Sequence, residues 1–121
     1  IDELFPVAET LQLLRFAELE GGDLTLTEAG LAFATAALDE RKRIFARQLL
    51  TYVPLAAHVR RVLDERTSHV ARKSRFIDEL EDFMTEDDAE QTLRAIVGWG
   101  RYAEVFAYED ESARFTLENP A

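Results

Sequence analysis

One pattern of residues occurs twice in this chain, once toward each end. Residues 10–19 contain Thr-Leu followed by Arg-Phe-Ala-Glu-Leu, and residues 92–105 contain Thr-Leu followed by Arg-Tyr-Ala-Glu-Val. Each copy leads into a turn and a second alternating stretch, at 24–26 and 115–117. Alternation of apolar and polar residues is the signature of a strand, so the pattern predicts a helix followed by a two-stranded hairpin, twice.

The first copy has clear local signals. Asp2 is placed to cap a helix whose apolar stripe comprises Leu4, Val7, Leu11 and Leu14. Gly21 and Gly22 tolerate positive φ and favour a tight turn between strands at 15–20 and 24–27. Thr27 then caps a helix that we expect from 28 to about 38.

Between the two copies we expect further helices. One runs from about 39 to 51, and Pro54 interrupts or restarts it toward residue 65, because proline removes a helical hydrogen bond. Residues 67–73 are interpreted as a basic loop. Ser74 is expected to cap a short helix that is buried through Phe76, Ile77, Leu80, Phe83 and Met84. Thr85 caps the last helix, and the three acids that follow it suit the positive helix end.

These elements predict a mainly helical α+β chain. Three helices and a hairpin make a winged helix, and residues 41–121 contain those parts in order. Residues 1–40 supply a last helix, a wing and a following helix, so we expect a first winged-helix-like unit that is truncated at its N-terminus. We therefore expect the chain to be a piece of a longer protein.

Charge is segregated along the chain, whose formal net charge is -10. Residues 1–40 carry about -8, residues 41–75 about +8 and residues 76–121 about -10 when acids are subtracted from bases. The basic segment could neutralise the acidic flanks within the fold or across a self-association interface. Alternatively, six of its residues form an exposed site for an acidic partner: Arg60, Arg61, Arg66, Arg72, Lys73 and Arg75. We name these six the basic set.

Several chemistries are disfavoured by the residues present. The chain has no cysteine, which excludes disulfides and thiolate metal sites. His58 and His69 lack the spacing of a zinc site, so a surface role is expected for both. The acid-rich run at 78–88 lacks the glycine and alternate ligands of an EF-hand and is interpreted as solvated helix faces. We therefore expect no metal.

Other binding chemistries are also weighed. The aromatic residues between 99 and 108 could stack on a ligand, but core packing is the favoured interpretation, with Gly98 and Gly100 allowing close approach. No phosphate-binding loop, serine elbow or acid/base pair is found, so no catalytic or cofactor-binding residue is assigned. The helix after Thr85 begins with Glu86, Asp87 and Asp88, which would repel DNA.

With these residues in view, the chain resembles the C-terminal AAA-associated domain at the end of ATP-binding subunits of nitrate/sulfonate/bicarbonate-type ABC transporters. The resemblance spans essentially the whole chain. It rests on residues 13–27 (LLRFAELEGGDLTLT), 40–43 (ERKR), 53–58 (VPLAAH), 62–66 (VLDER), 79–82 (ELED), 99–104 (WGRYAE) and 117–120 (LENP).

The resemblance implies a non-catalytic regulatory or protein-interaction domain of an importer's ATP-binding subunit. ATP and Mg²⁺ would then be bound only by an ATPase domain upstream of this chain. The implied partners are that ATPase domain, the transporter subunits and a second copy in a homodimer, with no nucleic acid and no direct membrane insertion. The implied location is cytoplasmic, peripheral to a bacterial inner membrane.

Two other functions stay open. The first is a nucleic-acid-binding regulator that uses the basic segment and the wings. The second is a sensor of a small anion, for which His58 and the arginines are suitable, although the sequence does not locate a pocket.

Overall fold

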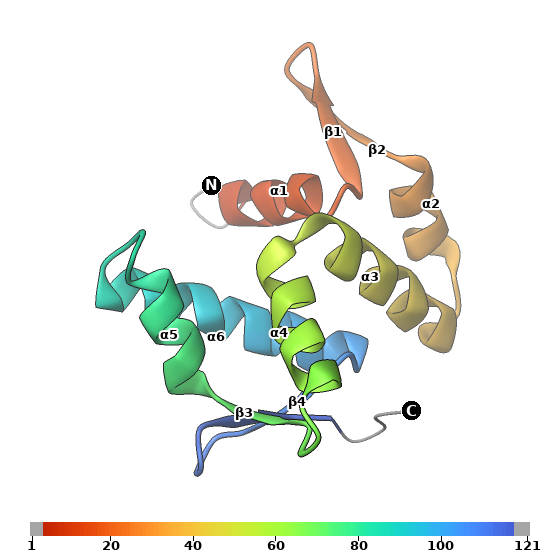
Figure 1. The fold of residues 1–121 in the computed structure, drawn as a ribbon. Coiled ribbons are helices and arrows are strands. Elements are labelled where there is room, and N and C mark those ends of the chain that lie inside the picture. The colour runs from red at the N-terminus through yellow and green to blue at the C-terminus, as the bar shows by residue number, and fades with distance from the viewer. Residues whose placement is uncertain (1–3, 118–121) are drawn as a thin grey trace. The chain divides into compact units, whose positions relative to one another are not determined.

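The computed structural model describes residues 4–117, with side chains from Glu9 onward. Over these residues it contains six helices, a two-stranded sheet and a three-stranded sheet (Figure 1). The chain divides into two compact units, residues 1–54 and 55–121. The mainly helical α+β class is confirmed, whereas the division into winged-helix-like units at 1–40 and 41–121 stays a prediction. The expected cap at Asp2 lies outside the described residues.

The first unit holds a helix, a hairpin and two further helices. They are α1 (Leu4–Leu13), β1 (Ala17–Glu20), β2 (Asp23–Leu26), α2 (Glu28–Thr35) and α3 (Leu38–Tyr52). The strands are antiparallel, with Glu20 opposite Asp23. Gly21 and Gly22 form the turn between them at φ of 56° and 90°, values that glycine adopts at little cost. The predicted hairpin is therefore confirmed.

Thr27 fixes the start of α2, as the sequence predicts. Its hydroxyl accepts a hydrogen bond from the Gly30 N–H at 3.0 Å and donates one to the Arg15 carbonyl at 2.6 Å. A Cβ added at Gly30 would lie 1.9 Å from the carbonyl oxygen of Phe16. Glycine is thus required where α2 meets the chain that enters β1.

The core of the first unit is built on aromatic rings. The rings of Phe16 and Phe33 stack with centroids 4.8 Å apart, and that of Phe45 lies 6.0 Å from Phe16. Gln48 is buried, and its amide donates to the Leu14 carbonyl at 3.0 Å, so a backbone oxygen beyond the end of α1 is satisfied inside the core.

The second unit contains three helices and a three-stranded sheet. Its elements are α4 (Pro54–Glu65), β3 (Val70–Arg72), α5 (Lys73–Leu80), α6 (Glu86–Ala103), β4 (Ala107–Glu109) and β5 (Arg114–Thr116). α4 begins at Pro54, where the sequence predicts a restart. The strand order is β3-β5-β4, all antiparallel. Three helices, a first strand and a hairpin follow one another here in the order typical of a winged helix.

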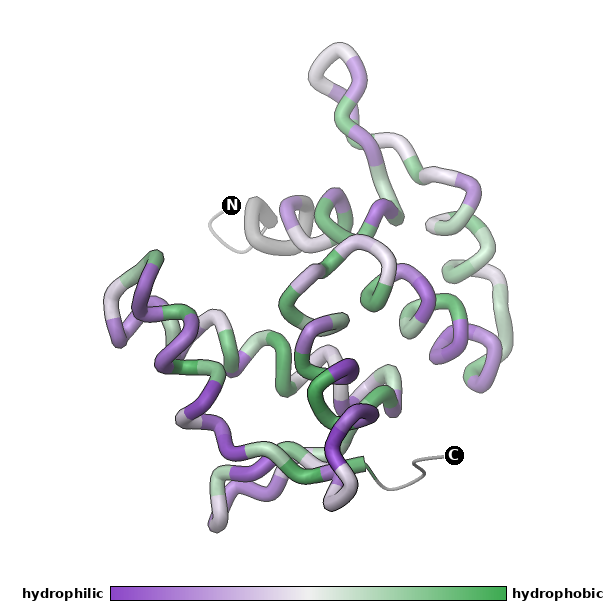
Figure 2. The backbone as a smooth tube through the Cα atoms, viewed as in Figure 1, coloured by the Kyte–Doolittle hydropathy of each residue, from purple (hydrophilic) through white to green (hydrophobic). Residues whose placement is uncertain are grey.

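Phe115 lies at the centre of this second core and is fully buried. Its ring centroid is 5.4 Å from that of Phe76, 5.2 Å from Phe106 and 4.9 Å from Tyr108. The helices contribute the buried aliphatic residues Ala56, Val59, Val62, Leu63, Ile77, Ala89, Leu93 and Ile96. The alternation of hydrophobic and hydrophilic residues along these helices can be followed in Figure 2.

Two local predictions between α4 and α6 are wrong. Residues 67–73 are not all loop, because Val70–Arg72 pair with β5. Ser74 does not cap α5, which begins one residue earlier, at Lys73, with Arg72 at the N-cap and no side-chain cap bond. The Lys73 N–H donates instead to the Ala113 carbonyl at 2.9 Å. A backbone carbonyl next to β5 therefore satisfies a donor at the start of α5.

Two predictions about side-chain environment are also wrong. Phe83 was expected in the core but is 86% exposed, because α5 ends at Leu80 and the chain turns there, with the Phe83 N–H donating to the Leu80 carbonyl. Gly98 was expected to permit a close approach, but a Cβ added there meets nothing within 4 Å. Gly100 does serve that purpose, since an added Cβ would lie 2.1 Å from the Phe106 ring.

Candidate functional site

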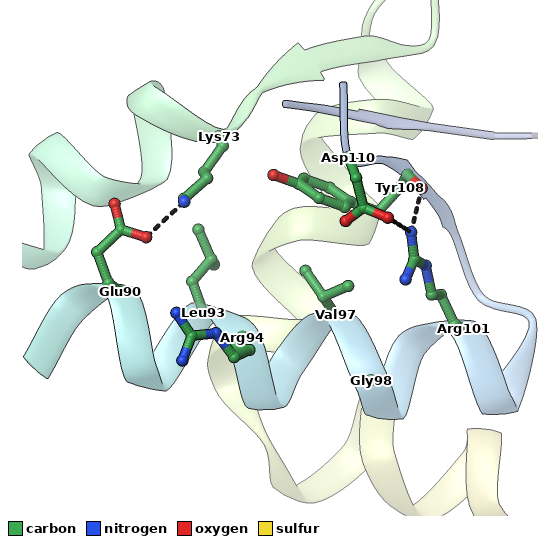
Figure 3. A pocket seen from close by; sticks show the side chains of 9 residues that line it. All are labelled: Lys73, Glu90, Leu93, Arg94, Val97, Gly98, Arg101, Tyr108 and Asp110. Carbon is green, nitrogen blue, oxygen red and sulfur yellow. Dashed lines mark hydrogen bonds and ion pairs between the residues drawn. The ribbon is translucent and has the colours of Figure 1, made fainter. Parts of the chain in front are cut away.

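A groove of about 390 Å³ runs along one side of α6 in the second unit (Figure 3). We call it the α6 groove. Its lining comes from α6, from the first residue of α5 and from the hairpin: Lys73, Glu90, Leu93, Arg94, Val97, Gly98, Arg101, Tyr108 and Asp110. The α6 residues recur at spacings of three and four, so they lie on one face of the helix.

Two ion pairs close the ends of the α6 groove. Lys73 at the start of α5 pairs with the carboxylate of Glu90 on α6. At the other end, Arg101 pairs with Asp110 at 3.3 Å and donates to the Tyr108 carbonyl at 2.5 Å. These contacts tie α6 to α5 and to the hairpin, so they set the width of the groove.

The floor between the ion pairs is apolar. Leu93 and Val97 point between the two pairs in Figure 3, and Gly98 leaves open space beside them. Arg94 is exposed and makes no ion pair or hydrogen bond within the described part of the chain. The groove is therefore suited to an apolar side chain accompanied by a negative charge.

The basic set is divided by the structure into anchored and free residues. Arg60 donates to the Val105 carbonyl at 2.7 Å, and Arg66 donates to the Val70 carbonyl at 3.0 Å. Lys73 is held by Glu90. Within the basic set, Arg61 and Arg72 alone are exposed without a partner among the described residues.

Arg75, the remaining member of the set, belongs to a small polar cluster. Its guanidinium donates to Glu79 at 3.0 Å, and the ring nitrogen Nε2 of His58 lies 2.8 Å from the same carboxylate. Burial acts to raise the pKa of Glu79, but the hydrogen bonds and charges of Arg75 and His58 hold it below its ordinary value of 4.5.

Both histidines make side-chain contacts that the sequence does not predict. The His58 ring meets the edge of Phe76, with centroids 5.8 Å apart. Nδ1 of His69 lies 2.8 Å from the Leu63 carbonyl oxygen, and the backbone of His69 has a positive φ of 54°. Both side chains are half-buried, which sequence spacing alone does not reveal.

The described residues form no site for a metal ion or for stacking of a ligand on aromatic rings. Over residues 4–117, no group of three or more His, Asp or Glu side chains is arranged to hold a metal ion. Phe106 is buried and Tyr108 contacts Phe115, so these rings serve in packing. The charge pattern of the sequence does not reveal the α6 groove, although the helical spacing of Glu90, Arg94 and Arg101 indicates a shared face.

The hairpin of the first unit presents a second candidate surface. Leu19 is paired with Leu24, and Leu26 is paired with Ala17, so all four lie on one face of the hairpin. The three leucines are exposed, Leu19 by 61%, and we call them the leucine face. The opposite face carries Glu18, Glu20, Asp23 and Thr25.

Comparison with known proteins gives one match. The family model described as the C-terminal AAA-associated domain matches residues 1–109. No curated protein and no solved structure matches the chain. Among the described residues, no helix is both long enough and apolar enough to span a bilayer.

Proposed function

Because this chain belongs to the C-terminal AAA-associated domain family, we propose that it regulates an ABC transporter ATP-binding subunit without itself catalysing a reaction. The family match over residues 1–109 is the observation that carries the proposal. In this proposal the ATPase domain lies in the same protein and binds the ATP and Mg²⁺. The subunit serves import of an anion of the nitrate/sulfonate/bicarbonate type, on the cytoplasmic side of the inner membrane.

The surfaces of the chain support a role in protein contact. Apolar side chains gathered on an exposed sheet face, as in the leucine face, are typical of interaction sites. The α6 groove offers apolar floor and charged walls, a composition typical of specific contacts. Neither surface brings together a nucleophile and a base, so binding is the chemistry that each can perform.

The mechanism we propose is a difference in affinity. The chain contacts its ATPase domain, or a second copy in the ATPase dimer, more favourably in one nucleotide state than in the other. A contact with unequal affinity for two states shifts the equilibrium between them by that difference. ATP binding would thus change the contact, and the contact would change the closure of the dimer.

Charge reversal at the two free arginines tests this proposal. In this proposal Arg61 and Arg72 contact an acidic surface of the partner. The variant Arg61→Glu/Arg72→Glu should therefore change the ATP hydrolysis rate of the ATP-binding subunit and flatten the salt dependence of that rate, because contacts between charges are screened by salt. Arg60 and Lys73 are unsuitable for such a test, because they anchor the fold.

A control is Arg43→Glu/Arg47→Glu, which makes the same change of charge at two exposed arginines outside the basic set, where Arg43 gives up an exposed pair with Glu40 and Arg47 a 3.4 Å contact with Gln48. The proposal predicts a near-normal rate for this control. If both double variants hydrolyse ATP like the unmodified subunit at every salt concentration, the basic set has no regulatory role.

The winged-helix arrangement favours one second candidate, a nucleic-acid-binding regulator. The charges weigh against it, since α6 begins with Glu86, Asp87 and Asp88, and Asp110 occupies the tip of the hairpin. A mobility-shift assay of the chain with duplex DNA at low salt distinguishes the two. Phosphate contacts would give binding that weakens steeply as salt rises.

A further inference from the structure

Two arginines face each other across the second sheet. Arg72 on β3 is directly opposite Arg114 on β5. The flanking hydrogen bonds run from the Lys73 N–H to the Ala113 carbonyl and from the Leu117 N–H to the His69 carbonyl. Because hydrogen-bonded and non-hydrogen-bonded pairs alternate in an antiparallel ladder, the two arginines occupy a non-hydrogen-bonded position, where side chains lie closest.

Neither arginine of this pair forms an ion pair with a described carboxylate. Like charges directly opposite on neighbouring strands are destabilising. Within residues 4–117 neither arginine forms an ion pair, although the whole chain has 24 acids for 14 lysines and arginines. Glu109 lies opposite Arg114 on the other side, but its carboxylate accepts the Ser112 hydroxyl at 2.9 Å.

A surface hollow of about 400 Å³ is lined by both arginines together with Ser74, Ser112 and Ala113. The first turn of α5 also contributes to it through Ser74. That turn holds no acidic residue, and its N-cap, Arg72, makes no side-chain capping bond. The positive end of α5 therefore adds to the positive charge of the two guanidinium groups.

We propose that this hollow binds a small tetrahedral oxyanion, held between the guanidinium groups of Arg72 and Arg114. An anion there removes the repulsion between the arginines and receives charge-assisted hydrogen bonds from both. The hydroxyl of Ser74 is available as a further donor, whereas that of Ser112 is taken by Glu109. Lys73 is directed to Glu90 instead and belongs to the α6 groove.

The probe is inorganic phosphate, titrated into the 121-residue chain while sodium chloride holds the ionic strength constant. Amide NMR shifts should saturate at Arg72, Ser74 and Arg114. The variant Arg114→Gln should weaken binding about tenfold or more, the effect expected for loss of one charge-assisted hydrogen bond to an ion. Without phosphate, this variant should melt at the same temperature as the unmodified chain or higher, because it removes the like-charge pair.

The matched control is Arg61→Gln, which removes an exposed arginine that does not line the hollow and should bind phosphate normally. Sulfate should compete with phosphate, and planar nitrate should compete less well. Shifts that do not saturate, or equal weakening in Arg61→Gln, would mean an adventitious ion only and overturn the proposal. Equal competition by nitrate would overturn the assignment of a tetrahedral anion.

The phosphate titration tests the oxyanion site independently of the proposed function, because it is measured on the isolated chain without an ATPase. A chain that binds phosphate but leaves ATP hydrolysis unchanged would keep the oxyanion site and reject the regulatory role. Failure of the unmodified chain to bind phosphate saturably, together with altered hydrolysis in Arg61→Glu/Arg72→Glu, would reject the oxyanion site and keep the regulatory role.

Discussion

Gly98 and Gly100 lie two residues apart in α6 and have opposite surroundings. A methyl group at position 98 would enter the open space of the α6 groove, whereas one at position 100 would lie 2.1 Å from the ring of Phe106. The two positions therefore separate the backbone effect of a helical glycine from the effect of close packing.

We expect Gly98→Ala to stabilise the chain by about 0.5–1 kcal/mol, because alanine loses less backbone entropy than glycine in a helix. Gly100→Ala should destabilise it by about 1–3 kcal/mol, because Phe106 must leave its position. Urea unfolding of both variants measures the two free energies. Changes of the same sign at both positions would contradict the packing described around Phe106.

Glu79 makes a pH-dependent contribution to the stability of the fold. Its folded pKa lies below the ordinary 4.5, through the opposing contributions of burial and of its two partners. The unfolded carboxyl consequently binds a proton first as the pH falls. The stabilisation is present above that ordinary value and is lost as the pH falls through the folded pKa.

The variant Glu79→Gln should therefore be less stable than the unmodified chain near neutral pH, and the difference should shrink as the pH falls below about 4. Urea unfolding between about pH 6 and pH 3 measures it. The exposed Glu81 supplies the control Glu81→Gln, which should leave the curve unchanged. A difference that stays constant with pH would show that Glu79 contributes by shape and not by charge.

At the scale of elements, two threonine caps can be compared. Thr85 accepts one hydrogen bond, from the Asp88 N–H at 3.2 Å, whereas Thr27 accepts from Gly30 and also donates to Arg15. Thr27 thus joins α2 to the hairpin as well as capping the helix.

We expect Thr85→Ala to lower the free energy of unfolding by about 1 kcal/mol and Thr27→Ala by up to about 2 kcal/mol. Thermal or urea unfolding of the two variants gives the comparison, with the exposed Thr67→Ala as the control. A smaller loss at Thr27 than at Thr85 would mean that the bond to the Arg15 carbonyl adds nothing to stability.

Local signals predicted most helices and the first hairpin. They placed the second hairpin too early, because the alternating residues 101–105 include the end of α6, and the first strand of that hairpin is Ala107–Glu109. The caps at Thr27 and Thr85, the restart at Pro54 and the glycine turn each act within a few residues, so sequence spacing is enough to place them. β3 was missed because a strand of three residues, Val70–Arg72, is too short to show a detectable alternation. It exists because β5, more than 40 residues later, supplies its hydrogen bonds.

The candidate sites were less predictable for the same physical reason. The six cations of the basic set lie within residues 60–75, but their roles depend on partners elsewhere in the fold. Arg60 is anchored by Val105 and Lys73 by Glu90, while Arg72 is placed opposite Arg114. Such pairings require the tertiary fold, so charge counting alone could not separate structural arginines from free ones.

At the scale of the whole molecule, a strongly acidic chain keeps part of its positive charge free. Among the lysines and arginines of the second unit, Arg60, Lys73, Arg75 and Arg101 form salt bridges. Arg61, Arg72, Arg94 and Arg114 make no ion pair in the described part of the chain. We infer that free cations and exposed leucines together serve binding, in keeping with an accessory domain.

The regulatory claim requires unequal affinity for two nucleotide states. It is tested by titrating the 121-residue chain into the ATP-binding subunit that lacks this domain, once without nucleotide and once with ATP under conditions that prevent hydrolysis. We predict that the dissociation constants differ by about fivefold or more, the usual size of an allosteric coupling. Equal dissociation constants in the two states, or no binding in either, would contradict the account.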